Sequence, residues 1–367
     1  MPQMPQMPQT PRLDEGATKL VTFAIPCYNS ADYMDHCVTS IIAACSDAAE
    51  PVASEADFEV IIVDDGSQRD DTPAKADAWA ARLPGVVRAV HQENGGHGAA
   101  VLTGLANARG MYFKVVDSDD WIDRDAGRTL LADMRRLVAA GERVDLFVTN
   151  YVYEHVADDT RTAIGYRHVL PQGRVFTWDE MGRFRIDQNL LMHALTYRTA
   201  VLRDGGVPLP RHTFYVDNIY AYVPLPRCER LYYDDVDLYR YFIGRDDQSV
   251  NEAVMTKRYR QQILITRIMV DAYHLFDDVR SEPLRRYMLG YLTMMLTISS
   301  IFAHLSEEPS SEQDLRDLWQ HLREFDERMY AHARHGVLGT FSNLPGTVGR
   351  RVTTGLYHVA QKVVKFN

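Results

Sequence analysis

The feature that most constrains this fold is an alternation of short apolar runs with helical patterns between residues 20 and 150. The apolar runs are Leu20–Ile25, Phe58–Val63, Val86–His91, Met111–Val116 and Val144–Thr149. The helical patterns between them are Ala31–Cys45, Thr72–Leu83, Ala99–Arg109 and Asp123–Ala140. Apolar strands that alternate with helices predict an α/β fold, with a mostly parallel central sheet flanked by helices.

Each of the first four apolar runs is followed by a polar cluster. The clusters are Pro26-Cys27-Tyr28-Asn29, Asp64-Asp65-Gly66-Ser67, Glu93-Asn94-Gly95-Gly96-His97-Gly98 and Asp117-Ser118-Asp119-Asp120. In sheets of parallel strands, ligands bind outside the carboxyl ends of the strands. The four clusters therefore predict one ligand site at one edge of the sheet.

The acidic cluster that begins at Asp117 carries two carboxylates in a D-x-D spacing just past a predicted strand. Such carboxylates can converge on a hard cation, and an ion with few protein ligands keeps positions free for substrate phosphates. An acidic turn that caps the next helix is the alternative, since Asp is a common N-cap residue. Its position beside three other polar turns favours a metal-assisted reaction on a phosphorylated donor.

Two of the other clusters contain groups that suit a nucleotide. The Tyr28 ring can stack on a base, and the Asp65 carboxylate can accept a hydrogen bond from the base or the ribose. A core position for Tyr28 and a plain tight turn at Asp65 are the alternatives. The Gly-rich turn from Asn94 to Gly98 precedes a helix, whose N-terminal N–H groups favour a diphosphate. It lacks the Lys-Ser/Thr ending of a P-loop.

Together these motifs resemble the family 2 glycosyltransferases with the GT-A (Rossmann-like) fold. The matching residues are Phe23–Asn29, Ile61–Ser67, Asn94–Gly98 and Val116–Trp121, then Phe214–Asn218 and Tyr241–Ser249 in the second half. The resemblance covers residues 19–250. The Q-x-x-R-W signature of processive synthases is absent, because Gln248 is followed by Ser249-Val250-Asn251. Addition of a single sugar is therefore favoured over polymerisation.

The resemblance implies a nucleotide-sugar donor, most commonly a UDP-sugar, with inversion at the anomeric carbon and a Mg²⁺ or Mn²⁺ cofactor. It makes Asp119 the metal ligand, with Asp117 on the metal or the ribose and Ser118 beside the ribose. The other donor-binding candidates are Pro26, Tyr28, Asp65, Asn94, His97, Arg245 and Gln248. For Arg245 a surface salt bridge is the alternative.

The resemblance also implies that Asp217 is the base that takes a proton from the acceptor hydroxyl. The usual Glu before it is Val216 here, and an N-cap for Asn218–Val223 is the alternative. His193 can line an acceptor pocket or be a core histidine. Asp120 can lie near the sugar hydroxyls or cap a helix. For Tyr151, Tyr153 and Trp178, structural packing is favoured over sugar stacking.

The implied function is cell-surface polysaccharide or glycolipid biosynthesis, with a glycan or lipid-linked acceptor. Two alternatives stay open: a non-catalytic nucleotide-sugar-binding protein and a metal-dependent nucleotidyltransferase. The latter normally shows a basic Gly-rich loop after the first strand, where this chain has Tyr28-Asn29. A net charge of -10 argues against a nucleic-acid partner.

The 367 residues divide into four predicted parts. These are a disordered leader (1–18), a catalytic domain (19–250, with halves 19–150 for the nucleotide sugar and 151–250 for the acceptor), a helical appendage (251–335) and a basic amphipathic tail (336–367). The appendage is predicted from helical patterns at Tyr259–Phe276, Leu284–Leu305 and Glu312–Ala333. The leader repeats Met-Pro-Gln and lacks the features of a signal peptide.

The basic tail predicts contact with an anionic membrane surface, because no acidic residue follows Glu327 and Val352–Phe366 is amphipathic. A helix packed on the appendage is the alternative. No run reaches 18 apolar residues, so a membrane-spanning helix is not expected. The four cysteines form no C-x-x-C pair, which disfavours zinc and predicts reduced thiols. We expect a cytoplasmic protein, peripheral at the inner face of the plasma membrane.

Overall fold

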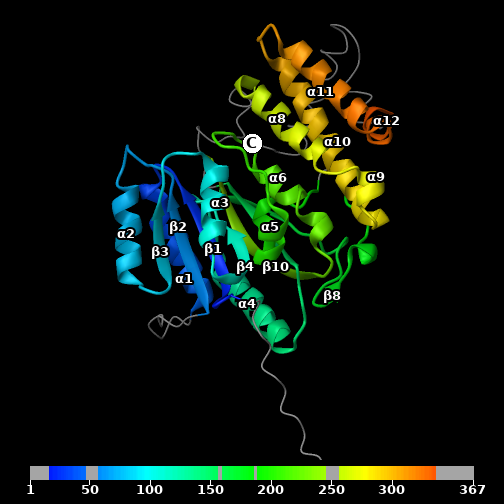
Figure 1. Cartoon of the computed structure of the whole chain (residues 1–367). Helices are drawn as coiled ribbons and strands as arrows, with labels where there is room; N and C mark the ends of the chain where they lie inside the picture. Colours follow the sequence, from blue (N-terminus) through cyan, green and yellow to red (C-terminus); the bar gives the residue numbers. More distant parts are fainter. Residues whose placement is uncertain (1–15, 47–56, 156–158, 186–187, 245–255, 336–367) are drawn as a thin grey trace, which may run out of the picture.

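A computed structural model of the chain describes residues 16–46, 57–155, 159–185, 188–244 and 256–335. One mixed sheet runs through the domain, with the central strand order β3-β2-β1-β4-β9-β6-β10-β5. Helices flank this sheet, and a group of C-terminal helices, yellow to orange in Figure 1, lies beyond it. The predicted α/β fold with a helical appendage is confirmed.

The first half of the sheet is parallel, as the alternating pattern predicts. Its strands are β1 (Lys19–Cys27), β2 (Phe58–Asp64), β3 (Val87–His91) and β4 (Gly110–Val115). Its helices are α1 (Ala31–Cys45), α2 (Thr72–Arg82), α3 (His97–Asn107) and α4 (Arg124–Ala139). Strands β1, β2 and β4 are almost wholly buried, so they form the centre of the core.

The second half of the sheet is mixed, which the sequence pattern does not predict. Strand β9 (Leu195–Arg198) lies antiparallel between β4 and β6 (Leu146–His155), and β10 (Leu231–Ile243) runs parallel to β6. Three short strands pair antiparallel at the margins, and these are β5 (Trp121–Ile122), β7 (Thr160–Ile164) and β8 (Val175–Phe176). Two short helices, α5 (Thr199–Gly205) and α6 (Asp217–Tyr222), connect β9 to β10.

The appendage contains more helices than the sequence pattern predicts. They are α8 (Tyr259–Asp271), α9 (Leu275–Asp278), α10 (Glu282–Leu305), α11 (Ser311–Phe325) and α12 (Glu327–His335). The predicted continuous helices at Tyr259–Phe276 and Glu312–Ala333 are wrong, because each is broken. At the second break, the Asp326 carboxylate accepts hydrogen bonds from the N–H groups of Arg328 and Met329. A side chain that serves these N–H groups starts a new helix.

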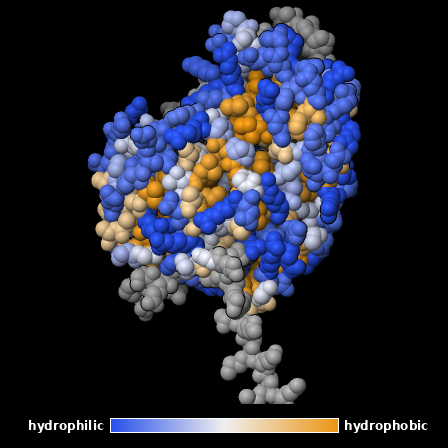
Figure 2. Space-filling model, viewed as in Figure 1, coloured by the Kyte–Doolittle hydropathy of each residue, from blue (hydrophilic) through white to orange (hydrophobic). Residues whose placement is uncertain are grey.

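Helix α10 is long and apolar enough to cross a membrane by length and composition, although polar residues interrupt its apolar sequence. In the fold, 67% of its most apolar window is buried, so packing within the appendage accounts for that composition. Figure 2 shows apolar residues on the surface in the middle of the same view, near the junction of the sheet domain and the appendage. Beneath the surface, one buried apolar cluster contains residues of both parts, such as Tyr232 of the sheet and Tyr287 of α10.

Gly110 generates a prediction about the β1–β4 contact. A Cβ atom at Gly110 would lie 2.6 Å from the carbonyl carbon of Val21 and would overlap the N–H of Thr22. Backbone atoms cannot yield without breaking strand pairing, so Gly110→Ala is expected to lower the free energy of unfolding by about 1–3 kcal/mol or more. The matched control is Gly290→Ala in helix α10, where nothing lies within 4 Å of the new atom.

Gly290→Ala is expected to raise the free energy of unfolding by about 0.5–1 kcal/mol, because Ala loses less chain entropy in a helix. Urea denaturation followed by circular dichroism measures both variants. Equal effects of the two substitutions would contradict the close β1–β4 approach.

Candidate active site

The polar turns predicted from the sequence meet at the carboxyl ends of the parallel strands. Asp117 follows β4, and Asp65 follows β2, whose pairing with β1 places Cys27 opposite Asp64. His97 is the first residue of α3 and Asp217 is the first residue of α6. The sheet thus brings one polar group from each turn to the same edge.

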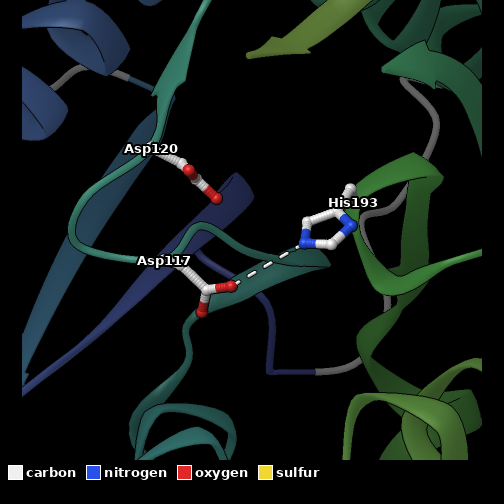
Figure 3. A group of neighbouring side chains, drawn as sticks. All are labelled: Asp117, Asp120 and His193. Carbon is white, nitrogen blue, oxygen red and sulfur yellow. Dashed lines mark ion pairs between the residues drawn. The ribbon is translucent and has the colours of Figure 1, made fainter. Parts of the chain in front are cut away.

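Asp117 is the centre of this site. One carboxylate oxygen lies 2.7 Å from Nε2 of His97, and the other lies 3.8 Å from Nε2 of His193 (Figure 3). Its backbone N–H donates to the Tyr239 hydroxyl at 3.0 Å. Burial alone would raise the pKa of Asp117, but the two imidazoles outweigh it and hold that pKa well below its usual range. Asp117 is therefore an ionised carboxylate at neutral pH.

His97 responds to the same charges. Burial lowers the pKa of His97, but the carboxylate of Asp117, with smaller contributions from Asp217 and Asp119, raises the pKa above its ordinary value overall. The raised pKa favours the protonated form of His97, which begins α3 beside Asp117. Positive charge at this position would suit an anionic ligand.

Asp120 holds the acidic turn against β10. It is 1% exposed, and its carboxylate accepts hydrogen bonds from the Tyr239 hydroxyl at 2.6 Å and the Phe242 N–H at 2.8 Å. Burial, followed by the charges of Asp119 and Asp117, raises its pKa well above the ordinary value. The suggestion that Asp120 caps a helix is wrong, because Asp123 is the N-cap of α4 and accepts the N–H groups of its first turn.

The residues at the centre fit a divalent cation. Side-chain ligand atoms of Asp117, Asp120 and His193 all lie within 4.8 Å of one another, and Figure 3 shows the three side chains directed into one space. Asp119 is half-buried beside them but is not a member of this group. The group therefore contains Asp117 of the predicted Asp119–Asp117 pair. Two carboxylates and an imidazole suit Mn²⁺ better than Mg²⁺, which prefers oxygen ligands.

His193 belongs to the site rather than to the core alone. It lies in the 3₁₀ turn η2 (Met192–Ala194) and is 7% exposed. Its ring packs against the rings of Tyr151, Tyr239 and Tyr241. Its Nδ1 atom is buried without a hydrogen-bond partner in the described part of the chain. A buried ring with an unsatisfied nitrogen marks a place for a ligand or an ordered water.

Lys114 is a supporting residue that the sequence analysis missed. It is fully buried in β4, and its Nζ donates to the backbone carbonyl oxygen of His193 at 2.8 Å. The ammonium also lies 5.4 Å from the centroid of the Tyr239 ring. Burial lowers its pKa to about 7. A lone charged residue inside the apolar run Met111–Val116 was the signal that could have identified it.

Asp65 shapes the Gly-rich turn. One carboxylate oxygen accepts from the Gly95 N–H at 2.8 Å and from the Gln92 side chain at 2.6 Å, and the other accepts from the Gly96 N–H at 2.8 Å. The Asn94 side chain donates to the Asp65 carbonyl oxygen at 3.0 Å. Both oxygens thus orient the turn that leads into α3, and a direct contact of Asp65 with the nucleotide stays a prediction.

Three other donor-site candidates lie near this turn or the acidic one. Tyr28 is 50% exposed at the end of β1, so the alternative of a core aromatic is wrong. Pro26 is buried in β1, where it pairs with Val63. The Ser118 hydroxyl donates to the Ser30 hydroxyl at 2.8 Å, which ties the acidic turn to the start of α1. Arg245 and Gln248 lie outside the described residues.

Asp217 begins helix α6 directly after a strained stretch, since Tyr215 has a φ of 66°. Burial raises the pKa of Asp217, His193 and His97 oppose that rise, and the net pKa stays above its ordinary value. The N-cap alternative is wrong, because the N-cap residue of α6 is Val216. The next residue, Asn218, accepts a hydrogen bond from the Tyr291 hydroxyl of α10 at 2.9 Å. The appendage therefore supports the position of Asp217.

The other aromatic residues considered above, and the four cysteines, all lie in the described part of the chain. Trp178 is buried and its Nε1 donates to the Leu225 carbonyl oxygen at 3.2 Å, so its predicted packing role is confirmed. Tyr151 is buried as well, and Tyr153 packs against it with ring centroids 5.3 Å apart. All four cysteines are free thiols, as predicted.

Parallel strands with acidic turns at their carboxyl ends, followed by an antiparallel strand in the same sheet, form a fold of the GT-A type. Residues 22–199 match the family model for glycosyl transferase family 2. Residues 22–199 belong to the family 2 glycosyltransferases. The predicted family and fold are thereby confirmed.

Similar proteins come from several bacteria. The chain is 33% identical over 225 residues to EpsH of Bacillus subtilis, a proposed glycosyltransferase, with 57% of this chain and 60% of that protein covered. It is 29% identical over 175 residues to glycosyltransferase GlyA of Streptococcus pneumoniae, covering 45% of this chain and 23% of GlyA. Each match spans less than two thirds of the relative.

The fold is similar to that of S. aureus TarS (residues 1–349), crystallised in complex with UDP. The TM-score is 0.64 at 18% identity, over 93% of this chain and 92% of that chain. At this level of identity the likeness concerns the fold. It includes the C-terminal helices, because nearly the whole of both chains is covered.

Lys114 generates a pH prediction. Its pKa is lowered in the folded protein, so between about pH 7 and the unfolded pKa near 10.4 the unfolded chain binds more protons. The free energy of unfolding should therefore rise with pH across that window. Relative to Lys114→Met, the wild-type protein is expected to gain about 2–3 kcal/mol of stability between roughly pH 7 and pH 9.5. Urea titrations at both pH values measure this difference, and a constant difference would contradict the lowered pKa.

Proposed function

We propose that this protein transfers one sugar from a UDP-sugar to an acceptor hydroxyl, with inversion at the anomeric carbon. The observation that carries the proposal is the coupling of the half-buried Asp217 to the charges of His97, His193 and Asp117 at the carboxyl edge of the sheet. A base on one side and a charged anion site on the other are what an inverting displacement needs. Family membership supports the reaction class.

The donor is assigned to the edge formed by β1, β2 and β4. TarS binds UDP and UDP-GlcNAc in crystals, which supports a UDP-sugar here. The exposed Tyr28 ring can stack on the base, and the Gly95–Gly96 turn places the N-terminus of α3 near the diphosphate. Positive charge on His97 adds attraction for the phosphate oxygens.

A divalent cation completes the donor site in this proposal. Asp117, Asp120 and His193 are placed to hold it, and the neighbouring Asp119 remains the ligand that the family resemblance implies. When bound, the ion acts as a Lewis acid that stabilises charge on the leaving diphosphate. The chain itself keeps Asp117 ionised by pairing it with two imidazoles, so the carboxylate is available at neutral pH.

Asp217 is assigned as the base. Burial raises its pKa, which makes the carboxylate a stronger proton acceptor, and the nearby imidazoles oppose part of that rise. It takes the proton of the acceptor hydroxyl on the face opposite the leaving group, and this geometry inverts the anomeric centre. A non-catalytic binding protein would have no use for this group, so we favour the enzyme.

Asp217→Asn tests the proposal. The amide cannot accept a proton, so hydrolysis of UDP-GlcNAc with Mn²⁺ is expected to fall at least about 100-fold, the usual worth of a positioned base. Binding of UDP should persist, because the substitution keeps shape and lies on the acceptor side. Hydrolysis is measured by release of UDP, and binding by the thermal shift with UDP and Mn²⁺.

The matched comparison is Asp119→Ala. This variant is expected to lose the Mn²⁺-dependent part of UDP binding and to lose hydrolysis with it. A near-normal hydrolysis rate in Asp217→Asn would show that Asp217 is not the base. Undiminished Mn²⁺ dependence in Asp119→Ala would show that Asp119 is not a metal ligand, and the ligands would then be Asp117, Asp120 and His193.

We further propose a place for the enzyme at the inner face of the plasma membrane, where it adds a sugar to a glycan or lipid-linked acceptor of a cell-surface polysaccharide or glycolipid. The basic, amphipathic sequence of residues 340–367 supports adhesion to anionic lipid. That tail lies outside the described residues.

Deletion of residues 340–367 tests the membrane proposal. Binding to phosphatidylglycerol vesicles is expected to fall, because basic side chains near an anionic surface contribute roughly 1 kcal/mol each. Hydrolysis of UDP-GlcNAc should be unchanged. Sedimentation with vesicles measures the first and UDP release the second. Equal vesicle binding by both proteins would refute the tail as the anchor.

A further inference from the structure

A second concave site lies away from the candidate active site. It is a cavity of about 370 Å³ between helix α5, the segment before β6 and the 3₁₀ turn η3 (Leu225–Arg227). Three arginines line it, Arg143, Arg198 and Arg227, together with one acid, Asp204. We call it the arginine cavity. Residues far apart in the sequence form it, so it depends on the tertiary fold.

The arginine cavity lies at the opposite edge of the sheet from Asp117. Arg198 ends β9 and pairs with Tyr112 near the start of β4, whereas Asp117 follows the end of β4. The five residue steps from Tyr112 to Asp117 span roughly 16 Å of extended chain. A ligand in the arginine cavity therefore cannot be the diphosphate of a donor in the candidate active site.

Asp145 holds two of the arginines in place. It is fully buried, and one carboxylate oxygen lies 2.8 Å from Nε of Arg143 and 3.6 Å from Nη1 of Arg198. Its other oxygen accepts the backbone N–H groups of Glu229 and Arg230. Backbone N–H groups thus hold one side of the carboxylate, and the other side contacts two guanidinium groups.

Arg227 adds a third positive charge without a carboxylate partner in the described residues. Its Nη1 donates to the carbonyl oxygen of Gly206 at 3.2 Å, just past the end of α5. Any side chain at Gly205 would overlap the guanidinium group, so a glycine there makes the space in which Arg227 lies. The lining of the cavity thus offers three guanidinium groups beside the carboxylate of the exposed Asp204.

We propose that the arginine cavity binds a phosphate group, carried as a phosphomonoester or phosphodiester on a ligand other than the donor. Guanidinium groups match phosphate oxygens in geometry and charge, and several of them together suit a tetrahedral oxyanion. The volume falls within the range of about 300–1,000 Å³ that is usual for small-molecule sites. The cavity therefore has room for the phosphate and for part of the molecule that carries it.

Thermal shifts with inorganic phosphate, in the presence of saturating UDP and Mn²⁺, test the site. UDP fills the candidate active site, so a remaining rise in Tm with phosphate reports a second site. The rise is expected in the wild-type protein and is expected to be lost in Arg227→Gln and in Arg143→Gln. The matched control is Arg124→Gln, because Arg124 is an exposed arginine that pairs only with its neighbour Asp125 among the described residues.

The shift caused by phosphate, rather than the absolute Tm, is compared, because Arg227→Gln also removes a bond to Gly206. Vesicles of phosphatidylglycerol against phosphatidylcholine separate the sources of the phosphate. Vesicle binding that falls in Arg227→Gln would name a lipid headgroup, and a phosphate shift without that fall would name a soluble phosphorylated ligand. Equal phosphate shifts in wild type, Arg227→Gln and Arg143→Gln would overturn the proposal, as would a shift that UDP abolishes.

Discussion

The pairing of Asp117 with two imidazoles is the interaction on which the rest of the site depends. Asp117 follows β4, His97 begins α3, and His193 lies in η2, before β9. These contacts therefore join three separate elements. Without the imidazoles, burial would raise the pKa of Asp117 and favour its neutral form. With them, the carboxylate stays charged in a buried place, which is the state that a cation site needs.

Support for that pairing comes from hydrogen bonds that other elements make to the site. The Tyr239 hydroxyl accepts the N–H of Asp117 and donates to Asp120, so β10 holds both ends of the acidic turn. Lys114 fixes the backbone of His193 from inside the sheet. Tyr291 of α10 fixes the start of α6 through Asn218. The appendage and the mixed half of the sheet thus hold the residues of the site in position.

Local pattern predicted the parallel half of the sheet and the polar turns at its carboxyl end well. The strands and helices of residues 19–139 are close to those expected, because apolar runs and helical spacing are local signals. The convergence of Tyr28, Asp65, Asn94 and Asp117 followed from one rule about parallel strands. The role of Asp65 in holding Gly95 and Gly96 could not follow from it, since that rule places turns and says nothing of which hydrogen bonds they make.

The sequence by itself determined the family, the parallel half of the sheet and the acidic turn, because these depend on residues near one another in the chain. Tertiary structure alone decided the ligand group of Asp117, Asp120 and His193, the burial of Lys114 and the arginine cavity. Each of these depends on residues that lie dozens of positions apart in the sequence. The antiparallel strand β9 places them near one another, and no local pattern predicted that strand. Charge interactions act through space, so a pKa or an ion site is set by which strands become neighbours.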